Sequence, residues 1–585
     1  MPSDHSVTTP HKVDAESREA FQRAANDSAV GCPVAQQGGW RDQPWRDRTG
    51  EVAAIFLLFL VYAGSAPPAV NEAHYLSKAR HYWQPTWAAG DLFLESLDAH
   101  GVFYWILGWL TVCFPLPVAA WVARAVSWLA LAAGWQRLSY AAVPWRWLSL
   151  WTAAVWLVLL EYGAMAGEWV VGGVEAKGLS YACVFWAISR FIRQRWSTGL
   201  LILGLATSCH VLVGGWSLVL AVMAWLSVGT RRPAMLSLLP AAAGAILLAL
   251  PGLWPALGLT RGQDPVVVLE ANWIYVFARL PHHLLFHALR WPDILAHTAL
   301  LVVWLVVGML TPCHLRSDHL GQRPLRGFVG GAVVLAIVGA VLDQLWLSDW
   351  ELAATFLKYY WFRLSDAMLP AGVALATGAA LMGWRIARPR LATLGLTLLG
   401  LFALVANWHH ARHSGLLSPD PIDLQLGRLA DLGWLSRSDV PRVAREWRST
   451  CRWIGEQTPL GTRFLTPRNQ MTFKWYAGRA EAVNVKDIPQ DARHVIRWQD
   501  RRELLYPPNT GPVGLLAHEP ERLLELARQF DCDYIVLDYF LARQAETPLE
   551  LPDWPLVYQS AGDRSSACFL VFKIPPQAAP TPGSK

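Results

Sequence analysis

Long apolar stretches occupy one continuous part of the chain, residues 51–410, and the segments on either side of it are polar. Many of these stretches approach the roughly 20 apolar residues that a helix needs to cross a hydrocarbon core about 30 Å thick. The pattern predicts about eleven membrane-crossing helices, near residues 51–66, 118–136, 147–163, 176–192, 198–212, 215–229, 234–252, 293–311, 327–347, 365–384 and 391–408. We therefore expect an α-helical polytopic membrane protein.

The spacers between the predicted helices alternate in charge, which orients the chain across the membrane. Arginines such as Arg190 and Arg195 occupy every second spacer, whereas carboxylates such as Glu168 and Glu175 occupy the others. Because cytoplasmic loops carry the excess of Lys and Arg, we expect a cytoplasmic N-terminus and an extracytoplasmic tail. The short apolar segment 100–114 is predicted to lie along the interface as an amphipathic helix, since another crossing would break the alternation.

The two polar flanks differ in pattern. Residues 1–50 lack apolar periodicity and predict a disordered cytoplasmic N-terminus. Residues 411–585 alternate helical and strand patterns, with helices near 441–457 and 520–530 and strands near 462–467, 533–539, 556–560 and 567–574. The expected order is a transmembrane domain at 51–410, with a first outer loop at 67–117, followed by a C-terminal α/β extracytoplasmic domain.

Composition narrows the class of protein. Apolar residues make up 54% of the chain and charged residues 16%, which argues against a series of soluble domains. Membrane topology accounts for most of the net charge of +6, so no nucleic-acid partner is expected. The eight cysteines show neither a CxxC pair nor a metal-ligand spacing, and no motif identifies a cofactor. A disulfide among Cys451, Cys532 and Cys568 of the tail stays open.

Four polar clusters flank the predicted helices and map to the outer side of the membrane. They span residues 71–80, 167–181, 274–287 and 357–370. Charged groups at such depths usually face a cavity or a partner. The candidate phosphate-binding residues are Lys177, Arg279, Arg363, His210 and His283, and the candidate supporting residues are Tyr75, Asp91, Glu175 and Asp366. A carboxylate, cations for a phosphate and an apolar surface are the parts that a lipid-phosphate-sugar transferase needs.

Simpler interpretations of the same residues stay open. The first cluster is also typical of an aromatic belt at a membrane interface. Arg363 and Asp366 lie three positions apart, where two helical residues can pair. Glu175 and Lys177 lie two positions apart, where helical residues do not meet, so each is expected to have another partner.

An acidic residue, Glu72, follows the first predicted helix within a few positions, directly after Asn71. Together with the polytopic architecture and the outer tail, this arrangement resembles the GT-C glycosyltransferase superfamily, whose members carry an acidic residue at this point. The resemblance implies an inverting enzyme that uses a polyprenyl-phosphate-linked sugar on the outer face of a bacterial inner membrane. It also implies Glu72 as the general base or as a ligand of a divalent metal ion, with membrane lipids and the lipid-linked donor as partners.

Three longer motifs, at 172–178, 358–370 and 464–491, are similar to a group of planctomycete-type membrane proteins of unknown function. The third motif contains Lys474, Trp475, Tyr476 and Arg479, which we interpret as candidate acceptor-binding residues that act by stacking and hydrogen bonding. A solvated loop packed on the core of the tail is the other interpretation.

Two further function classes stay open. One is a non-catalytic membrane protein for the assembly or binding of envelope glycans. The other is a transporter, which fits less well because the polar groups gather at one face rather than at the middle of the membrane.

Overall fold

The computed structural model describes residues 45–69, 71–310, 322–418, 424–508, 510–544 and 550–576. Residues 1–44, most of the predicted disordered N-terminus, lie outside this range. The prediction of disorder is wrong for residues 45–50, which belong to helix α3.

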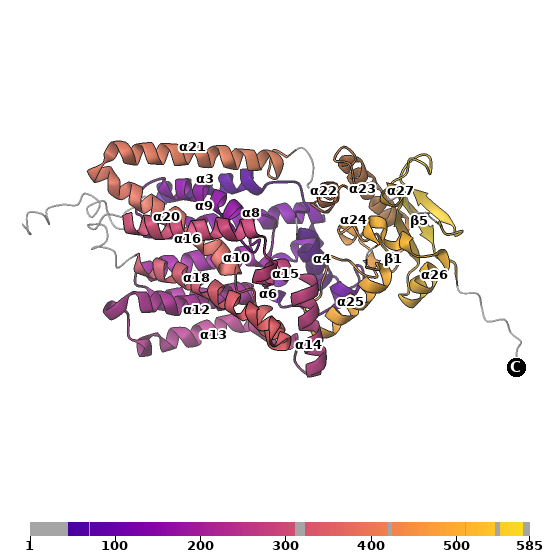
Figure 1. The fold of residues 1–585 in the computed structure, drawn as a ribbon, viewed down its shortest axis with the longest axis horizontal. Helices are drawn as coiled ribbons and strands as arrows, with labels where there is room; N and C mark the ends of the chain where they lie inside the picture. The colour runs from indigo at the N-terminus through magenta and orange to yellow at the C-terminus, as the bar shows by residue number, and fades with distance from the viewer. Residues whose placement is uncertain are drawn as a thin grey trace, which may run out of the picture. The chain divides into compact units, whose positions relative to one another are not determined.

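Each of the eleven apolar segments contains a helix in the structure (Figure 1). These helices are α3 (Trp45–Ala63), α8 (Leu116–Ala142), α9 (Leu148–Gly163), α10 (Ala176–Ile192), α11 (Trp196–Cys209), α12 (Val211–Ser227), α13 (Met235–Gly258), α16 (Trp291–Leu310), α18 (Arg323–Asp343), α20 (Arg363–Ala387) and α21 (Pro389–His413). Among the described residues, six helices are long and apolar enough to cross a membrane, namely α8, α13, α16, α18, α20 and α21. The chain is a mostly helical membrane protein, and the count of eleven crossings stays a prediction.

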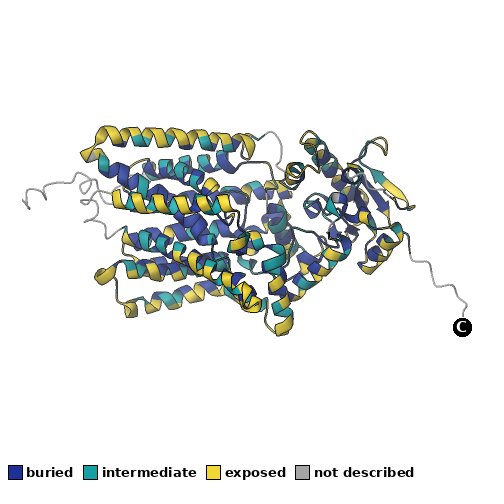
Figure 2. Cartoon of the chain, viewed as in Figure 1, coloured by how far each residue is buried: buried dark blue, intermediate teal, exposed yellow. Residues whose placement is uncertain are grey.

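The apolar helices pack around one core. Helix α20 contacts α9, α16, α18 and α21, and α10 contacts α8 and α11. In this core the rings of Trp135 and Trp156 stack with their centroids 4.4 Å apart, and Phe185 packs edge-on against both. The outer faces of α13 and α21 expose many leucines (Figure 2), as expected of surfaces that face lipid.

Short helices fill the connections that carry the polar clusters. The first outer loop contains α4 (Glu72–Trp83), α5 (Leu92–Glu95), α6 (Gly101–Leu107) and α7 (Leu110–Cys113). The connection between α13 and α16 contains α14 (Pro265–Trp273), η2 (Ile274–Arg279), α15 (Pro281–Leu284) and η3 (Phe286–Ala288). The connection before α20 contains η4 (Gln344–Leu347) and α19 (Trp350–Leu357). A further short helix, η1 (Gly229–Arg231), joins α12 to α13. The predicted amphipathic helix 100–114 is divided into α6 and α7, which are too short to cross a membrane.

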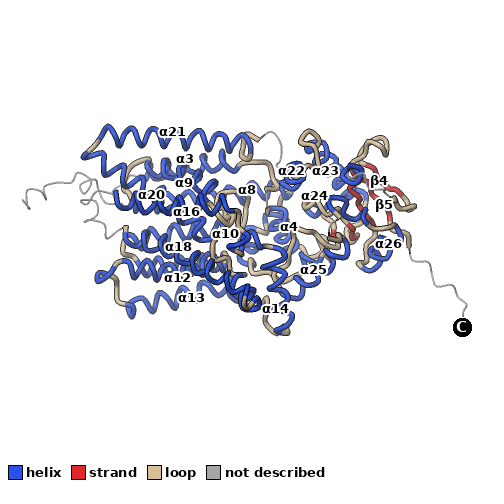
Figure 3. Tube along the Cα trace, in the orientation of Figure 1, coloured by secondary structure: helices blue, strands red, loops and turns tan. Residues whose placement is uncertain are grey.

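The tail is an α/β domain, and all strands of the described residues lie in it (Figure 3). Its strands are β1 (Arg463–Leu465), β2 (Ala480–Glu481), β3 (Tyr534–Asp538), β4 (Leu556–Gln559) and β5 (Phe569–Lys573), in the sheet order β2-β1-β3-β5-β4. Strand β1 pairs in parallel with β2 and β3, and β5 pairs antiparallel with β3 and β4. Its helices are α22 (Leu424–Asp431), α23 (Val440–Gln457), α24 (Phe473–Ala477), α25 (Ala492–Leu505), η5 (Gly511–Ala517), α26 (Pro520–Gln529) and α27 (Tyr539–Gln544).

Apolar periodicity explains the tail elements. Val443, Trp447 and Cys451 recur at the spacing of one helical face, and this face of α23 is buried. The buried run in β3 forms the middle of the sheet. The tail then contacts the first outer loop, because α24 packs against α4 and α25 packs against α5.

Candidate functional site

A cavity of about 1570 Å³ lies where the connections that carry the four polar clusters meet the tail. Its lining includes residues from all four polar clusters. Eight of the candidate residues line it, namely Tyr75, Glu175, Lys177, His210, Arg279, His283, Arg363 and Tyr476. Six do not, namely Glu72, Asp91, Asp366, Lys474, Trp475 and Arg479. The structure thus brings together the predicted phosphate-binding residues from four distant parts of the chain.

Two carboxylates and two cations form a compact cluster on the cavity wall. Lys177 Nζ lies 3.4 Å from Glu168 Oε2 and 3.3 Å from Glu175 Oε2. Arg363 Nε lies 3.1 Å from Glu168 Oε2, and its guanidinium lies over the ring of Tyr360, 3.9 Å from the centroid. The four charges of this cluster balance one another.

The ion pair between Glu175 and Lys177 corrects the expectation that these two residues would not meet. Glu175 immediately precedes α10, and its backbone is extended, with φ −142° and ψ 158°. The rule that residues two positions apart do not face each other holds only inside a helix. The extended backbone lets the Glu175 side chain reach Lys177, and Asn71 donates a hydrogen bond to the other carboxylate oxygen.

Asp366 holds the backbone of the loop before α10. Its carboxylate accepts hydrogen bonds from the backbone N–H groups of Met165 and Ala166, each at 2.9 Å, and of Glu168 at 3.2 Å. Helix α20 therefore fixes Glu168 twice, since Asp366 binds its backbone and Arg363 pairs with its side chain.

The carboxylate of Glu72 is fully engaged by other groups. Arg124 of α8 donates hydrogen bonds from Nε and Nη2 to its two oxygens, at 2.5 and 2.6 Å. The backbone N–H groups of Ala69 and Val174 donate to it at 2.7 and 2.9 Å. A Cβ on Gly173 would lie 2.9 Å from Glu72 Cγ, so glycine permits this approach. The geometry favours a structural role, in which Glu72 joins α4 to α8 and to the segment before α10, over proton transfer.

Arg279 and Lys486 are cations of the lining that have no ion pair with a carboxylate among the described residues. Arg279 Nε is buried and lacks a hydrogen-bond partner in the described part of the chain. Burial lowers the pKa of Arg279. Burial, reinforced by the positive charge of Arg279, lowers the pKa of Lys486 to about 8. A bound anion would relieve both effects, because it favours the charged form of each side chain.

Two histidines of the lining, His283 and His210, do not add to the positive charge of the cavity. His283 Nδ1 donates a hydrogen bond to the carbonyl of Ala166 at 2.5 Å, and burial lowers the pKa of His283 to about 4. His210 Nδ1 accepts from the N–H of Val213 at 3.3 Å, and its Nε2 lies 3.5 Å from Arg363 Nη1. Both rings therefore act as neutral groups at neutral pH.

A third histidine of the lining, His74, forms a pair with a carboxylate of the tail. Its Nδ1 lies 2.9 Å from Asp487 Oδ1, and its side chain is 16% exposed. Burial raises the pKa of Asp487, but Lys474 and His74 outweigh it and hold that pKa below its usual range. An ionised Asp487 fixes the ring with Nδ1–H donated and Nε2 as the acceptor. His74 belongs to the first polar cluster of the sequence, but its pairing could not be predicted, because Asp487 lies 413 residues further along the chain.

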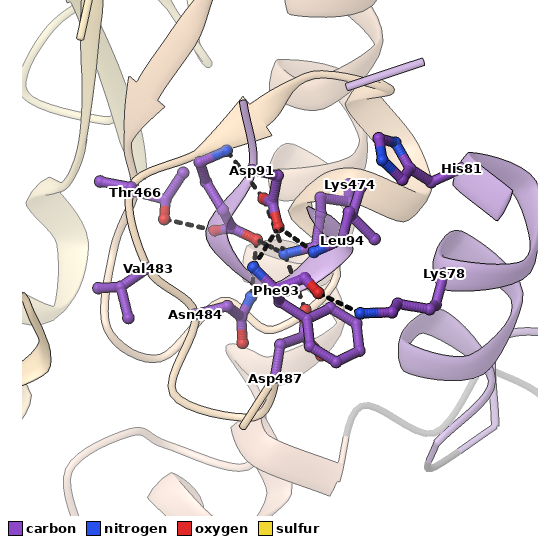
Figure 4. A network of polar contacts seen from close by, with 12 residues as sticks. Lys78, His81, Asp91, Phe93, Leu94, Thr466, Lys474, Val483, Asn484 and Asp487 are labelled. Atoms are coloured by element: carbon purple, nitrogen blue, oxygen red, sulfur yellow. Dashed lines mark hydrogen bonds and ion pairs between the residues drawn. The ribbon is translucent and has the colours of Figure 1, made fainter. Parts of the chain in front are cut away.

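Lys474 belongs to a buried network between the tail and the first outer loop (Figure 4). Its Nζ lies 3.3 Å from Asp91 Oδ2, 2.8 Å from Glu481 Oε1 and 2.8 Å from Asp487 Oδ2. Asp91 also caps α5, by accepting from the N–H groups of its first turn. Lys474 and Asp91 thus join two parts of the chain and do not contact the cavity.

The other candidates for acceptor binding have different environments. Trp475 is buried among apolar side chains of the first outer loop. Arg479 donates to the carbonyls of Gly455 at 2.8 Å and Thr458 at 2.6 Å, and so caps the end of α23. Tyr476 lines the cavity.

Cations outnumber carboxylates on the cavity lining by ten to three. The cations are Lys177, Arg279, Arg290, Lys358, Arg363, Arg428, Arg448, Arg468, Lys486 and Arg502, and the carboxylates are Glu168, Glu175 and Asp293. Leu253 and Leu257, at the end of α13, continue the lining as an apolar wall. A cavity with this balance attracts anions, and its apolar wall suits a ligand with a hydrocarbon part.

A divalent metal ion fits this lining poorly. The described residues contain no group of three or more His, Cys, Asp and Glu side chains that could hold a metal. Hard cations favour carboxylate oxygens, and the three carboxylates of the lining already pair with cations, Glu168 and Glu175 with Lys177 and Asp293 with Arg290.

One family model matches a small part of the sequence. Residues 445–505 match the family model of a domain of unknown function, DUF6798. No curated protein matches the chain.

Ten solved chains are similar to this chain, among them three structures of an archaeal oligosaccharyltransferase. The archaeal oligosaccharyltransferase AglB from Archaeoglobus fulgidus, in complex with an inhibitory peptide and a dolichol-phosphate, is 11% identical, with a TM-score of 0.39 over 86% of this chain and 70% of that chain. The Archaeoglobus fulgidus oligosaccharyltransferase with Zn and sulfate is 10% identical, with a TM-score of 0.42 over 84% and 68% of the two chains. Its apo form is 11% identical, with a TM-score of 0.40 over 86% and 70%. The case for a function therefore rests on the cavity and its charges.

Proposed function

We propose that the chain is a GT-C-like membrane glycosyltransferase that moves a sugar from a polyprenyl-phosphate donor to an envelope acceptor, on the outer face of a bacterial inner membrane. The observation that carries the proposal is the cavity at the outer connections, where ten cations face three carboxylates. Such a site stabilises the negative charge that develops on a departing lipid phosphate.

The lining supplies separate surfaces for the two ends of this donor. Arg279 and Lys486 bind the phosphate, since no carboxylate of the described residues pairs with either. Arg363 adds a further positive charge to the lining and is held in place by Glu168. The apolar end of α13 accepts the first isoprene units, as Leu257 illustrates.

His74 is the residue best placed to accept the proton. In an inverting transfer, the acceptor oxygen attacks the anomeric carbon, the bond from that carbon to the phosphate oxygen breaks, and a base takes the hydroxyl proton. His74 lines the cavity, and Asp487 orients its ring. Glu72, the base that the sequence resemblance implies, would instead anchor the first turn of α4, which carries His74.

Turnover by the full-length protein in lipid nanodiscs tests the proposal. The substrates are a panel of synthetic polyprenyl-phosphate sugars with an envelope glycan fraction, and the product is free polyprenyl phosphate. Arg279→Ala is expected to weaken donor binding about tenfold or more, because a hydrogen bond to a charged group contributes about 1.5–3 kcal/mol. His74→Gln is expected to lower kcat on the order of 10²-fold or more.

Arg437→Ala is the matched control, because Arg437 is an exposed tail arginine outside the lining. Donor binding by Arg279→Ala at wild-type affinity would contradict the proposed phosphate site. An unchanged kcat in His74→Gln would remove that residue from the chemistry.

A non-catalytic protein that binds lipid-linked envelope glycans is the second candidate. It is favoured by the pairing of Glu72 with Arg124 and of Glu168 and Glu175 with Lys177, which leaves no unpaired carboxylate among these three. Wild-type protein that binds the donor tightly but releases no polyprenyl phosphate with any acceptor would support this candidate over the enzyme.

A further inference from the structure

The tail forms one wall of the cavity, and the Lys, Arg, Asp and Glu residues that it contributes are all cations. They are Arg428, Arg448, Arg468, Lys486 and Arg502. They come from α22, from α23, from the segments after β1 and β2, and from α25. We call these five residues the basic wall.

The basic wall is not neutralised by the protein. None of its members has an ion pair with a carboxylate among the described residues, and the polar contacts that Arg448 and Arg468 make are to backbone carbonyls, of Ala444 and Gly511. Some arginines elsewhere in the tail do pair, as Arg437 does with Asp431 at 2.7 Å, Arg442 with Glu446 at 2.9 Å and Arg522 with Glu525 at 2.8 Å. The five cations of the basic wall line the cavity without such a partner among the described residues.

Some members of the basic wall are close enough to act on one another. After burial, the positive charges of Arg279 and Arg428 contribute to the lowered pKa of Lys486, against Glu175 and Asp487, and those of Arg279 and Arg468 contribute to the lowered pKa of Arg502. Holding like charges together costs free energy unless an anion joins them. Arg279, Lys486, Arg363 and Lys177 already serve the donor phosphate, so the four arginines of the basic wall exceed what one phosphate requires.

Aromatic rings accompany these cations. Trp434 lines the cavity with 42% of its surface exposed, and the half-buried Tyr476 lines the same cavity from the tail. Exposed aromatic faces beside hydrogen-bond donors suit sugar rings, which stack their C–H faces and leave their polar groups to the donors.

We infer that the acceptor is an anionic glycan, a saccharide chain that carries repeated carboxylate, phosphate or sulfate groups, and that the basic wall binds it. This inference rests on the proposed glycosyl transfer and names its acceptor class. The basic wall draws the chain to the cavity mouth by its charge, and Trp434 and Tyr476 hold the sugar that receives the transferred group.

Binding of a defined polyanionic oligosaccharide to the full-length protein in detergent tests the inference. The probe is a decamer of galacturonic acid, the neutral comparison is a galactose decamer, and affinities are measured at low and high salt. The galacturonate decamer is expected to bind at least about tenfold more tightly, which corresponds to about 1.4 kcal/mol, and to weaken as salt rises.

The charge-reversed variant R448E/R468E is expected to lose at least about tenfold in affinity for the decamer. The matched control is R437E/R564E, which changes the net charge of the tail equally at two exposed arginines outside the lining. An unchanged melting temperature and unchanged donor binding show that the variant is folded. Equal loss in both variants, or equal binding of the neutral decamer, would overturn the inference.

Two further outcomes separate this inference from the proposed function. Binding to vesicles of anionic lipid, without binding to the acidic decamer, would assign the basic wall to lipid headgroups and overturn the inference. Donor turnover that runs equally well with neutral glycans would overturn it and leave the glycosyltransferase intact. Selective decamer binding without any turnover would instead overturn the enzyme.

Discussion

Lys474→Met is the sharpest perturbation of the contact between the first outer loop and the tail. Three carboxylates converge on the Lys474 ammonium, from Asp91 of the loop and from Glu481 and Asp487 of the tail. Met conserves the length of the side chain but removes its charge. The three carboxylates would then share a buried site in which Asp487 keeps His74 as a hydrogen-bond partner.

The expected loss of stability is large. Removing one partner of a buried ion pair typically costs about 3–5 kcal/mol, because the other charge stays buried without compensation. A domain of this size loses about 2–4 °C in melting temperature for each kcal/mol, so the tail is expected to melt roughly 6–20 °C lower. Loss of this size is comparable with the whole stability of many domains.

The pH dependence of stability tests the same reasoning in a second way. Despite burial, Lys474 and His74 hold the pKa of Asp487 below its usual range, so the stabilisation from Asp487 is present above its ordinary pKa and is lost as the pH falls. Burial raises the pKa of Glu481, against the effect of Lys474. Without Lys474 these carboxylates gain protons more readily, so the deficit of the variant is expected to shrink as the pH falls.

Thermal melting and limited proteolysis of the full-length protein measure these effects. Lys573→Met, the same change at an exposed lysine at the end of β5, is the control and is expected to stay within about 0.5 kcal/mol of the wild type. A Lys474→Met variant that melts with the wild type at neutral pH would refute the reasoning, because it would mean that the network contributes nothing to the docking of the tail.

Two further predictions concern the cavity. Glu72→Gln leaves Arg124 buried without a charged partner and is expected to destabilise the protein by about 3–5 kcal/mol; a fully stable variant that has lost turnover would instead support Glu72 as the base. The pKa of Lys486 is lowered to about 8, so binding of the acidic decamer is expected to weaken above that pH as Lys486 loses its charge. Lys486→Arg is expected to remove this part of the pH dependence, and identical pH profiles for wild type and variant would count against it.

The positions of the apolar helices could be predicted closely because the membrane imposes a simple length rule. Each predicted span contains a helix in the structure. The helices of the tail could be predicted in the same way, from the periodic spacing of their apolar residues. The start of α3 at Trp45 could not be predicted from apolar residues, because the first turns of this helix are charged and do not resemble a membrane span. The two-residue strand β2 is too short to leave a periodic signal.

The partners of the candidate side chains could not be predicted, because they come from distant elements. Arg124 offered one signal, since an arginine inside the predicted span 118–136 is costly and needs a partner. That partner is Glu72, the residue that the first outer loop offers as a base. The spacing rule for helical residues also gave a wrong prediction at Glu175, because the backbone there is extended rather than helical.

The charged residues of the candidate site fall into two groups, those with an ion-pair partner in the part of the chain that the structure describes and those without one there. The charged residues that attract notice in the sequence, Glu72 and Lys474 among them, are compensated within the protein, and their charges hold its parts together. Two cations that have no carboxylate partner among the described residues, Arg279 and Lys486, lie on the cavity lining, where keeping them buried costs free energy. A protein retains such a cost where a ligand relieves it, so the uncompensated cations mark the binding site more reliably than the acidic residue beside the first helix does.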